Sequence, residues 1–268
     1  MSMMYITERV KEGGMMTTDA SGTVGKALGL LTLLGDHPHG ATAAQIAEQA
    51  HYPFSTVYRL LNTLVSTDFA AYDPQDKRYR LGLRVYQLGQ RVASTRGFEG
   101  TAAPILQRLT AATGESSILG VLDGPHFLTV RKVDGPQFRT TTDPGDHGSL
   151  HTSAIGKALL AFSDPGTRER LLGTIELVPR TEHSLSDREE LRRQLERVRA
   201  QGWAGQQEEN DVGMAAVAVP VLSPSQRLIA AVALAAPLFR TDLEGLQRCL
   251  PQLRQAATEL ALELPHRP

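Results

Sequence analysis

The stretch from Thr42 to Leu81 constrains the fold more than any other part of this 268-residue chain. It contains a short helical segment at 42–50, a break at 51–53 and a longer helical segment at 54–65. In the longer segment apolar residues recur at three- and four-residue steps, which is typical of a helix with one buried face. They are Val57, Leu60, Leu61, Leu64 and Val65. Two helices joined by a tight break indicate a helix-turn-helix.

The opposite face of the longer helix is polar and carries no acid. Its residues are Ser55, Thr56, Tyr58, Arg59, Asn62 and Thr63. Short or planar hydrogen-bonding side chains of this kind suit a helix that lies in the major groove and meets phosphates and base edges. A helical hairpin with an ordinary solvated face is the alternative that these two segments leave open.

A basic hairpin is predicted directly after this helix. Residues 70–72 and 78–81 read as short strands around a turn that contains Pro74 and two aspartates. Lys77, Arg78 and Arg80 can reach a neighbouring DNA backbone from such a wing. A supporting helix at 23–34 precedes the pair, with the stripe Val24, Ala27, Leu28, Leu31 and Leu34. Three helices and a wing predict a winged helix-turn-helix that binds double-stranded DNA.

Charge and composition narrow the class of protein. The whole chain has a formal net charge of −1 and residues 24–84 have +1, so we expect modest non-specific DNA affinity and several copies acting together. Cys249 is the single cysteine, which excludes an internal disulfide and a cysteine zinc site. The sequence has no apolar run suited to a signal peptide or a membrane span. We therefore expect a cytoplasmic protein without a cofactor or a membrane partner.

Four parts are expected along the chain. Residues 1–22 hold five of the six methionines among polar residues and predict a disordered extension, with translation starting at Met15 or Met16. The winged helix-turn-helix follows at 23–82, and a linker helix at 83–101 has the apolar positions Leu83, Tyr86, Leu88 and Val92. Residues 102–268 form a second domain.

The second domain mixes strands with helices. Strands are predicted at 116–122, 127–133, 138–142, 203–207, 214–222 and 228–235, and helices at 104–113, 153–161 and 187–201. The nearly unbroken apolar runs at 214–222 and 228–235 indicate strands covered on both faces. A last helix begins at Thr241, where Thr241 and Glu244 have capping-box spacing, and Pro251 predicts a kink or two successive helices. The expected class is α+β, a mostly antiparallel sheet with helices packed on it.

Several blocks of sequence, in this order and spacing from Thr23 onward, resemble the IclR family of bacterial transcription regulators. The blocks are Lys26-Ala27-Leu28, residues 54–61, Tyr79-Arg80-Leu81-Gly82, residues 150–161, residues 208–213 and Ala218-Val219-Pro220-Val221. The resemblance implies an N-terminal winged helix-turn-helix and a C-terminal GAF-like domain that binds a small effector. It also implies homodimers through the DNA-binding half, often paired into homotetramers.

The DNA-binding residues are expected on the second helix and the wing. Ser55 and Thr56 can reach phosphate oxygens, Arg59 can contact guanine with two hydrogen bonds, and Asn62 can read adenine. The remaining members of the expected set are Thr42, which also stands where a helix N-cap belongs, with Tyr58, Lys77, Arg78 and Arg80. An ion pair between Arg59 and an acid of the first two helices is the alternative for that residue.

An effector site is expected at the start of the helix near Ser153. Free N–H groups at a helix start favour a carboxylate, and the Ser153 hydroxyl can add a donor; alternatively Thr152 or Ser153 only caps its own helix. The resemblance implies pocket positions at Ser153, Ala154, Ile155, Gln206, Ala216, Ala233 and Ala235. Gln206 stands where the family often has an acid, and the last three alanines replace small polar residues. We therefore expect a bulkier acid, such as an aromatic carboxylate.

The sequence favours a ligand-responsive transcription regulator, for example a repressor. Two alternatives to such a regulator remain at this point. An enzyme could use His147 and His151 with Asp143, Asp146 and Ser153, but the chain has no nucleophile elbow, zinc-binding helix or phosphate loop, and we expect no enzyme. A GAF-like sensor could instead act through a protein partner. Salt-dependent DNA affinity would separate that sensor from a regulator.

Overall fold

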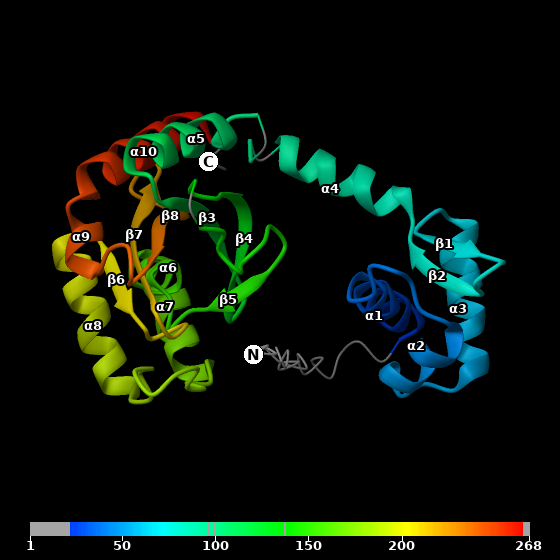
Figure 1. Ribbon diagram of the computed structural model, residues 1–268. Coiled ribbons are helices and arrows are strands. Elements are labelled where there is room, and N and C mark those ends of the chain that lie inside the picture. The colour runs from blue at the N-terminus through cyan, green and yellow to red at the C-terminus, as the bar shows by residue number, and fades with distance from the viewer. Residues whose placement is uncertain (1–21, 96, 99, 137, 265–268) are drawn as a thin grey trace, which may run out of the picture. The chain divides into compact units, whose positions relative to one another are not determined.

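The computed structural model describes residues 22–95, 97–98, 100–136 and 138–264 (Figure 1). Apart from Gly22, the predicted N-terminal extension and the predicted start codon lie outside the described residues. The backbone forms two compact units, with the boundary between Arg91 and Val92 inside helix α4 (Leu83–Thr95). Within the described ranges no helix combines the length and the apolar character that a bilayer crossing requires.

The N-terminal unit has the predicted succession of helices and hairpin. Thr42 caps α2 through a capping box with Gln45, and α3 follows a short break. The bounds are α1 (Thr23–Gly35), α2 (Ala43–Ala50), α3 (Phe54–Ser66), β1 (Ala70–Asp73) and β2 (Arg78–Leu81). The two strands pair antiparallel. The predicted winged helix-turn-helix is therefore confirmed.

The core of this unit is formed by one face of each helix. Val57, Leu60, Leu61 and Leu64 of α3 are buried, as their spacing predicts. They pack in one cluster with residues of α1 and α2 and with Tyr79 of the wing. The apolar spacing of α3 thus reports its buried face correctly.

The buried face of α1 differs from the predicted stripe. Leu30 and Leu34 are almost fully buried, whereas Val24 and Leu28 are 73% and 58% exposed. Apolar residues surround most of α1, so their periodicity does not single out one face. Contacts with α2 and α3 decide which leucines are buried.

Several turns in this unit have left-handed backbone, among them those at Asp68 and Gly40. Asp68 follows α3 with φ of 62°, a left-handed conformation that aspartate tolerates better than most residues. Gly40 has φ of 77°, and a Cβ atom there would lie 2.7 Å from Cγ of Arg80. At this point the loop after α1 meets β2, because Ala41 and Tyr79 exchange backbone hydrogen bonds of 3.0 and 2.8 Å.

The predicted linker helix is shorter than expected. α4 ends at Thr95 rather than near Thr101, and α5 (Ala102–Thr113) begins two residues before the predicted Pro104. No described residue of α4 is buried. Its apolar positions remain exposed: Leu83, Tyr86, Leu88 and Val92.

The C-terminal unit is built on a six-stranded sheet in the order β5-β4-β3-β8-β7-β6. Every neighbouring pair of strands is antiparallel. The strands are β3 (Ser116–Asp123), β4 (His126–Val133), β5 (His147–Ser149), β6 (Ala204–Gln207), β7 (Met214–Leu222) and β8 (Leu228–Pro237). The predicted class, an α+β fold with a mostly antiparallel sheet, is confirmed.

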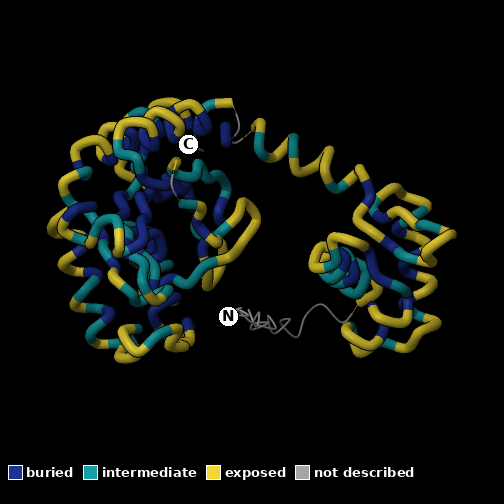
Figure 2. The backbone as a smooth tube through the Cα atoms, in the orientation of Figure 1, coloured by how far each residue is buried: buried dark blue, intermediate teal, exposed yellow. Residues whose placement is uncertain are grey.

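Helices cover both faces of this sheet (Figure 2). α5, α9 (Leu243–Gln247) and α10 (Leu250–Glu263) lie on one face; α6 (Ala154–Phe162), α7 (Pro165–Thr174) and α8 (Arg188–Gln201) lie on the other. Alternate residues of β8 face the two layers, for example Leu234 and Ala233. Double coverage explains the unbroken apolar runs in β7 and β8.

Three features of this unit differ from the predictions. Residues 138–142 form no strand beyond one bridge between Gly135 and Phe138, and the edge strand is β5 instead. α7 was not predicted. Asp242, not Thr241, caps α9 by accepting from the backbone N–H of Gly245. The break at Pro251 is confirmed, since α9 and α10 are separate helices and Pro251 lies in the first turn of α10.

Candidate DNA-binding surface and effector pocket

The face of α3 that is turned away from the core is polar and free of acids. Ser55, Tyr58, Arg59 and Asn62 are exposed, and Thr56 is half-buried. Among the described residues the Arg59 side chain has no ion-pair partner, so the intramolecular alternative is not observed there. The helix therefore offers a guanidinium, an amide and hydroxyl groups along one side.

The first turn of α3 adds backbone donors. Pro53 is the N-cap and contributes no side-chain cap, while its carbonyl accepts from Thr56 and Val57. The N–H groups of Phe54 and Ser55 have no acceptor among the described residues. Free N–H groups at a helix start bind phosphate oxygens well.

The wing presents its basic residues unequally. Lys77 is exposed at the turn with φ of 54°, and Arg80 is exposed beside Asp73 and Asp76 at 3.9 and 4.0 Å. Arg78 instead points inward, and its Nη1 donates to the carbonyl of Gly40 at 2.7 Å. The expected role of Arg78 at the DNA backbone thus competes with a structural role that its sequence position did not reveal. The same holds for Thr42, whose hydroxyl is engaged in the capping box.

All seven expected effector residues line one cavity of the C-terminal unit, with a volume of about 470 Å³. They are Ser153, Ala154, Ile155, Gln206, Ala216, Ala233 and Ala235. The cavity lies on the sheet face covered by α6, at the start of that helix. Sequence reasoning missed the rest of its lining, chiefly three aromatic rings, three threonines and a turn: Phe127, Phe138, Phe239, Thr140, Thr141, Thr142 and residues 210–214.

Gln206 has a fixed orientation. Its Oε1 accepts from the backbone N–H of Glu209 at 3.0 Å and from that of Asn210 at 3.5 Å. The side-chain nitrogen Nε2 therefore remains as a donor at the cavity wall, without a partner among the described residues. A glutamine at this position can donate to a ligand where a carboxylate would repel an acid.

The start of α6 supplies two further donors, but not the expected hydroxyl. Ser153 Oγ accepts from the N–H of Gly156 at 2.9 Å and donates to the carbonyl of Ser149 at 2.6 Å. The alternative in which Ser153 caps its own helix is therefore the one observed. The N–H groups of Ala154 and Ile155 have no acceptor among the described residues.

Charge is scarce around the cavity. Asp211 is the one charged side chain among the described lining residues, and it lies 3.9 Å from Arg180 outside the lining. No described lining residue is a lysine, arginine or histidine. Anion recognition here would depend on N–H donors rather than on a cation.

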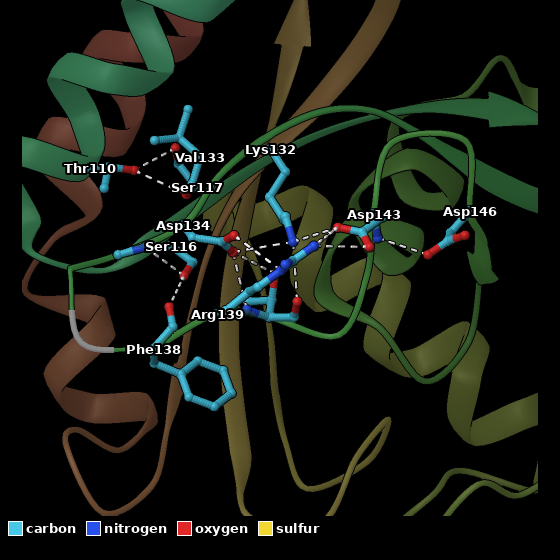
Figure 3. A network of polar contacts seen from close by, with 12 residues as sticks. Thr110, Ser116, Ser117, Lys132, Val133, Asp134, Phe138, Arg139, Asp143 and Asp146 are labelled. Carbon is cyan, nitrogen blue, oxygen red and sulfur yellow. Dashed lines mark hydrogen bonds and ion pairs between the residues drawn. The ribbon is translucent and has the colours of Figure 1, made fainter. Parts of the chain in front are cut away.

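One wall of the cavity is the loop between β4 and β5, and a network of ion pairs holds it (Figure 3). Lys132, with 5% of its side chain exposed, lies 2.9 Å from Asp143 and 3.2 Å from Asp134, and donates to the carbonyl of Thr140 at 3.1 Å. Arg139 pairs with the same two aspartates. Hydrogen bonds from Lys132 and Arg139 lower the pKa of Asp143.

The histidines considered for an enzyme have separate contacts. His147 is exposed and its Nε2 lies 2.8 Å from Oδ2 of Asp123. His151 is buried between Oγ of Ser149 at 2.9 Å and the carbonyl of Val178 at 3.2 Å, and burial lowers its pKa. Within the described residues no three His, Cys, Asp or Glu side chains are grouped as metal ligands. Both histidines have contacts that suit a structural role.

Comparison with known proteins agrees with this architecture. Family models for the IclR helix-turn-helix domain and for the C-terminal part of bacterial IclR transcriptional regulators match residues 23–74 and 90–262. The HTH-type transcriptional regulator BhcR of Paracoccus denitrificans is 30% identical over 97% of this chain and 94% of its own length. An IclR transcriptional regulator from Alicyclobacillus acidocaldarius, of known structure, is 29% identical, with a TM-score of 0.78 over 90% of this chain and 97% of its own.

A further solved structure is similar to this chain in its fold alone. It is an IclR homologue from Microbacterium hydrocarbonoxydans complexed with 4-hydroxybenzoate, 24% identical, with a TM-score of 0.80 over 91% of this chain and 99% of its own. The family models and the Paracoccus relative confirm the family that the sequence blocks resemble. The chain belongs to the IclR family of bacterial transcriptional regulators.

Proposed function

We propose that this regulator binds operator DNA through α3 and the wing, and that a small carboxylic acid in the cavity of the C-terminal unit modulates that binding. The protein would act in the cytoplasm, where its operator is. Because the two binding events are linked, DNA must change the affinity for the acid by the same factor as the acid changes the affinity for DNA.

The convergence of donors on one largely apolar cavity carries the proposal for the acid. Nε2 of Gln206 and the N–H groups of Ala154 and Ile155 are three donors without partners among the described residues. A carboxylate accepts strong hydrogen bonds from such groups. The volume of about 470 Å³ lies in the range of small-molecule sites.

The walls favour an aromatic acid. Phe127, Phe138 and Phe239 line the cavity together with the alanines of β7 and β8. Aromatic rings prefer offset or edge-to-face contacts with one another, which a planar ligand can satisfy. The homologue crystallised with 4-hydroxybenzoate illustrates that a protein of this fold can hold such a molecule.

For DNA, the exposed face of α3 would enter the major groove. Arg59 and Asn62 would read bases, Ser55 and Thr56 would contact phosphates, and Lys77 would reach the neighbouring backbone. Thr42, Tyr58, Arg78 and Arg80 complete the proposed set. Arg78 would act mainly by holding the wing to Gly40.

We also propose that the chain acts as a homodimer or homotetramer. α4 keeps its apolar positions exposed, and α1 exposes Val24 and Leu28, which leaves apolar surface for a second copy. A dimer would place two copies of α3 on half-sites about one helical turn apart. Sedimentation velocity of the full chain measures the oligomeric state directly. A monomer at all protein concentrations would contradict this part of the proposal.

The experiment that tests the proposed function is fluorescence anisotropy of the full chain with DNA from upstream of its own gene. The titration is run at several salt concentrations, against a scrambled duplex, with and without a panel of aliphatic and aromatic carboxylic acids. We expect preference for the upstream DNA, a steep salt dependence and a shift produced by an aromatic acid. Equal, salt-insensitive binding to both duplexes would contradict it and favour a sensor that acts through a protein partner.

A further inference from the structure

An exposed aromatic pair stands at the start of α3. Phe54 and Tyr58 are 54% and 49% exposed, and their rings are stacked with centroids 6.0 Å apart and planes at 19°. Phe54 does not belong to the core cluster of the N-terminal unit. A phenylalanine that leaves half its surface in water contributes little to the stability of the unit, because apolar surface stabilises only when it is removed from water.

The pair shares one strip of α3 with the polar DNA-binding candidates. The strip consists of Phe54, Ser55, Tyr58, Arg59 and Asn62, all exposed, at the spacings i, i+1, i+4, i+5 and i+8. Since successive residues of an α-helix turn by about 100°, these five positions lie on one continuous side. Whatever surface receives Arg59 and Asn62 therefore also meets the two rings.

The charge of this strip indicates the kind of surface. α3 contains no acid, it carries Arg59, and the N–H groups of Phe54 and Ser55 are free among the described residues. An anionic partner suits this combination better than an apolar protein face. In the major groove, the apolar group that a ring can contact is the C5-methyl of thymine.

We propose that Phe54, supported by the stacked ring of Tyr58, determines sequence specificity by packing against a thymine methyl group in the operator. This inference rests on the proposed DNA binding and adds an apolar contact to the hydrogen bonds of Arg59 and Asn62. The hydrocarbon ring of Phe54 has no donor for a phosphate, so its contribution is selective for sequence rather than uniform.

The test uses a duplex enriched from a randomised library by the wild-type full chain. Each thymine of that duplex is replaced in turn by deoxyuridine, which removes only the methyl group, and affinity is measured by anisotropy for the wild type, Phe54→Ala, Phe54→Leu and Leu262→Ala. Leu262 is an exposed apolar residue of α10 and serves as the matched control. Circular dichroism and thermal unfolding of each variant verify that it is folded.

We expect uracil at one or two positions to weaken wild-type binding roughly fourfold per methyl group. Phe54→Ala should lose this penalty at the same positions, Phe54→Leu should keep part of it, and Leu262→Ala should keep all of it. Equal uracil penalties in the wild type and in Phe54→Ala would overturn the inference, as would a change in sedimentation of Phe54→Ala with unchanged penalties. Failure of the wild type to enrich any duplex would instead overturn the proposed DNA binding itself.

Discussion

The Nζ atom of Lys157 lies 2.7 Å from Oε1 of Glu209, with 2% and 15% of the two side chains exposed. The pair connects α6 with the turn after β6, where the N–H of Glu209 donates to Gln206. Burial lowers the pKa of Lys157 and raises that of Glu209, so each charge depends on the other. This ion pair thus holds the turn that forms one side of the cavity beside Gln206.

Removing one member of that pair should leave a buried charge uncompensated. We expect Lys157→Met and Glu209→Leu each to lower the free energy of unfolding by roughly 3 kcal/mol, and the double variant Lys157→Met/Glu209→Leu to recover most of the loss. Urea denaturation of the full chain measures all three. Glu244→Gln, in an exposed pair with Arg248, is the control and should change little. Strictly additive losses in the double variant would contradict a coupled pair.

Acid should destabilise the C-terminal unit through His151. Its pKa is lowered by burial, so the unfolded chain binds a proton more readily than the folded chain. The contribution of this group to stability is complete above its unfolded pKa of about 6.5 and is lost as the pH falls through the lower folded value. Unfolding midpoints between pH 7.5 and 5 should therefore fall less steeply for His151→Gln than for the wild type. Parallel curves would contradict the prediction, and His126→Gln at an exposed position is the matched control.

The donor role of Gln206 can be tested by an isosteric change. Gln206→Glu keeps the acceptor for Glu209 and Asn210, but replaces the donor at the cavity wall with a negative charge. We expect at least tenfold weaker binding of the active carboxylic acid, measured by calorimetry. Gln207→Glu provides the control, since Gln207 is exposed and its Oε1 only accepts from the N–H of Leu243. An equal loss in both variants would assign the effect to the strand rather than to the donor.

Arg59 and Lys77 should affect DNA binding in different ways. Arg59→Ala is expected to relax the preference at one operator position at a cost of roughly 1–3 kcal/mol, because it would remove the proposed bidentate base contact. Lys77→Ala should weaken binding to all DNA sequences alike. It should also reduce the dependence of the binding constant on salt concentration by the amount that corresponds to about one phosphate contact. Selection of binding sites from a random library, followed by salt titrations, separates these effects. Unchanged sequence logos for both variants would exclude this division of roles.

The loop between β4 and β5 should depend on Lys132 more than on Arg139. Both residues pair with Asp134 and Asp143, but only Lys132 has a buried side chain and donates to the backbone of Thr140. We expect Lys132→Met to increase hydrogen exchange at residues 138–142 and to weaken acid binding several-fold. Arg139→Met, with 73% of the side chain exposed, should do neither. Equal effects of the two variants would show that burial of the lysine side chain does not decide how well this loop is held.

The sequence predicts the buried face of a helix best where the apolar residues lie on a single side of that helix. The spacing of Val57, Leu60 and Leu64 predicts the buried face of α3, and all three are buried. In α1 apolar residues occur on several sides, and the stripe chosen from spacing includes the exposed Leu28 but not the buried Leu30. The choice between such faces is made by tertiary contacts, which periodicity does not contain.

The same limit applies to the cavity. Its seven positions could be placed through the family resemblance, but its aromatic and threonine wall could not. Residues 138–142 have strand-like composition, yet they form no strand. The backbone N–H of Thr140 donates to Asp134 and the carbonyl of Phe138 accepts from Ser116, so side chains rather than a neighbouring strand provide these hydrogen-bond partners of the backbone. α7 was missed because Leu171 and Leu172 alone are buried among its described residues, which gives no helical repeat. Arg78 and Thr42 look available for DNA in sequence, although their internal partners appear only in the folded chain.

The amide of Gln206 faces two ways, toward the turn through Oε1 and toward the cavity through Nε2. Hydrogen bonds that share a polarisable group strengthen one another. A ligand that accepts from Nε2 would therefore tighten the bond to Glu209 and reduce the motion of residues 208–213, even if no atom of the turn is displaced. Binding of a ligand in the cavity would then lower the conformational entropy of this turn. Slower hydrogen exchange of the backbone amides of Glu209 and Asn210 would report that change.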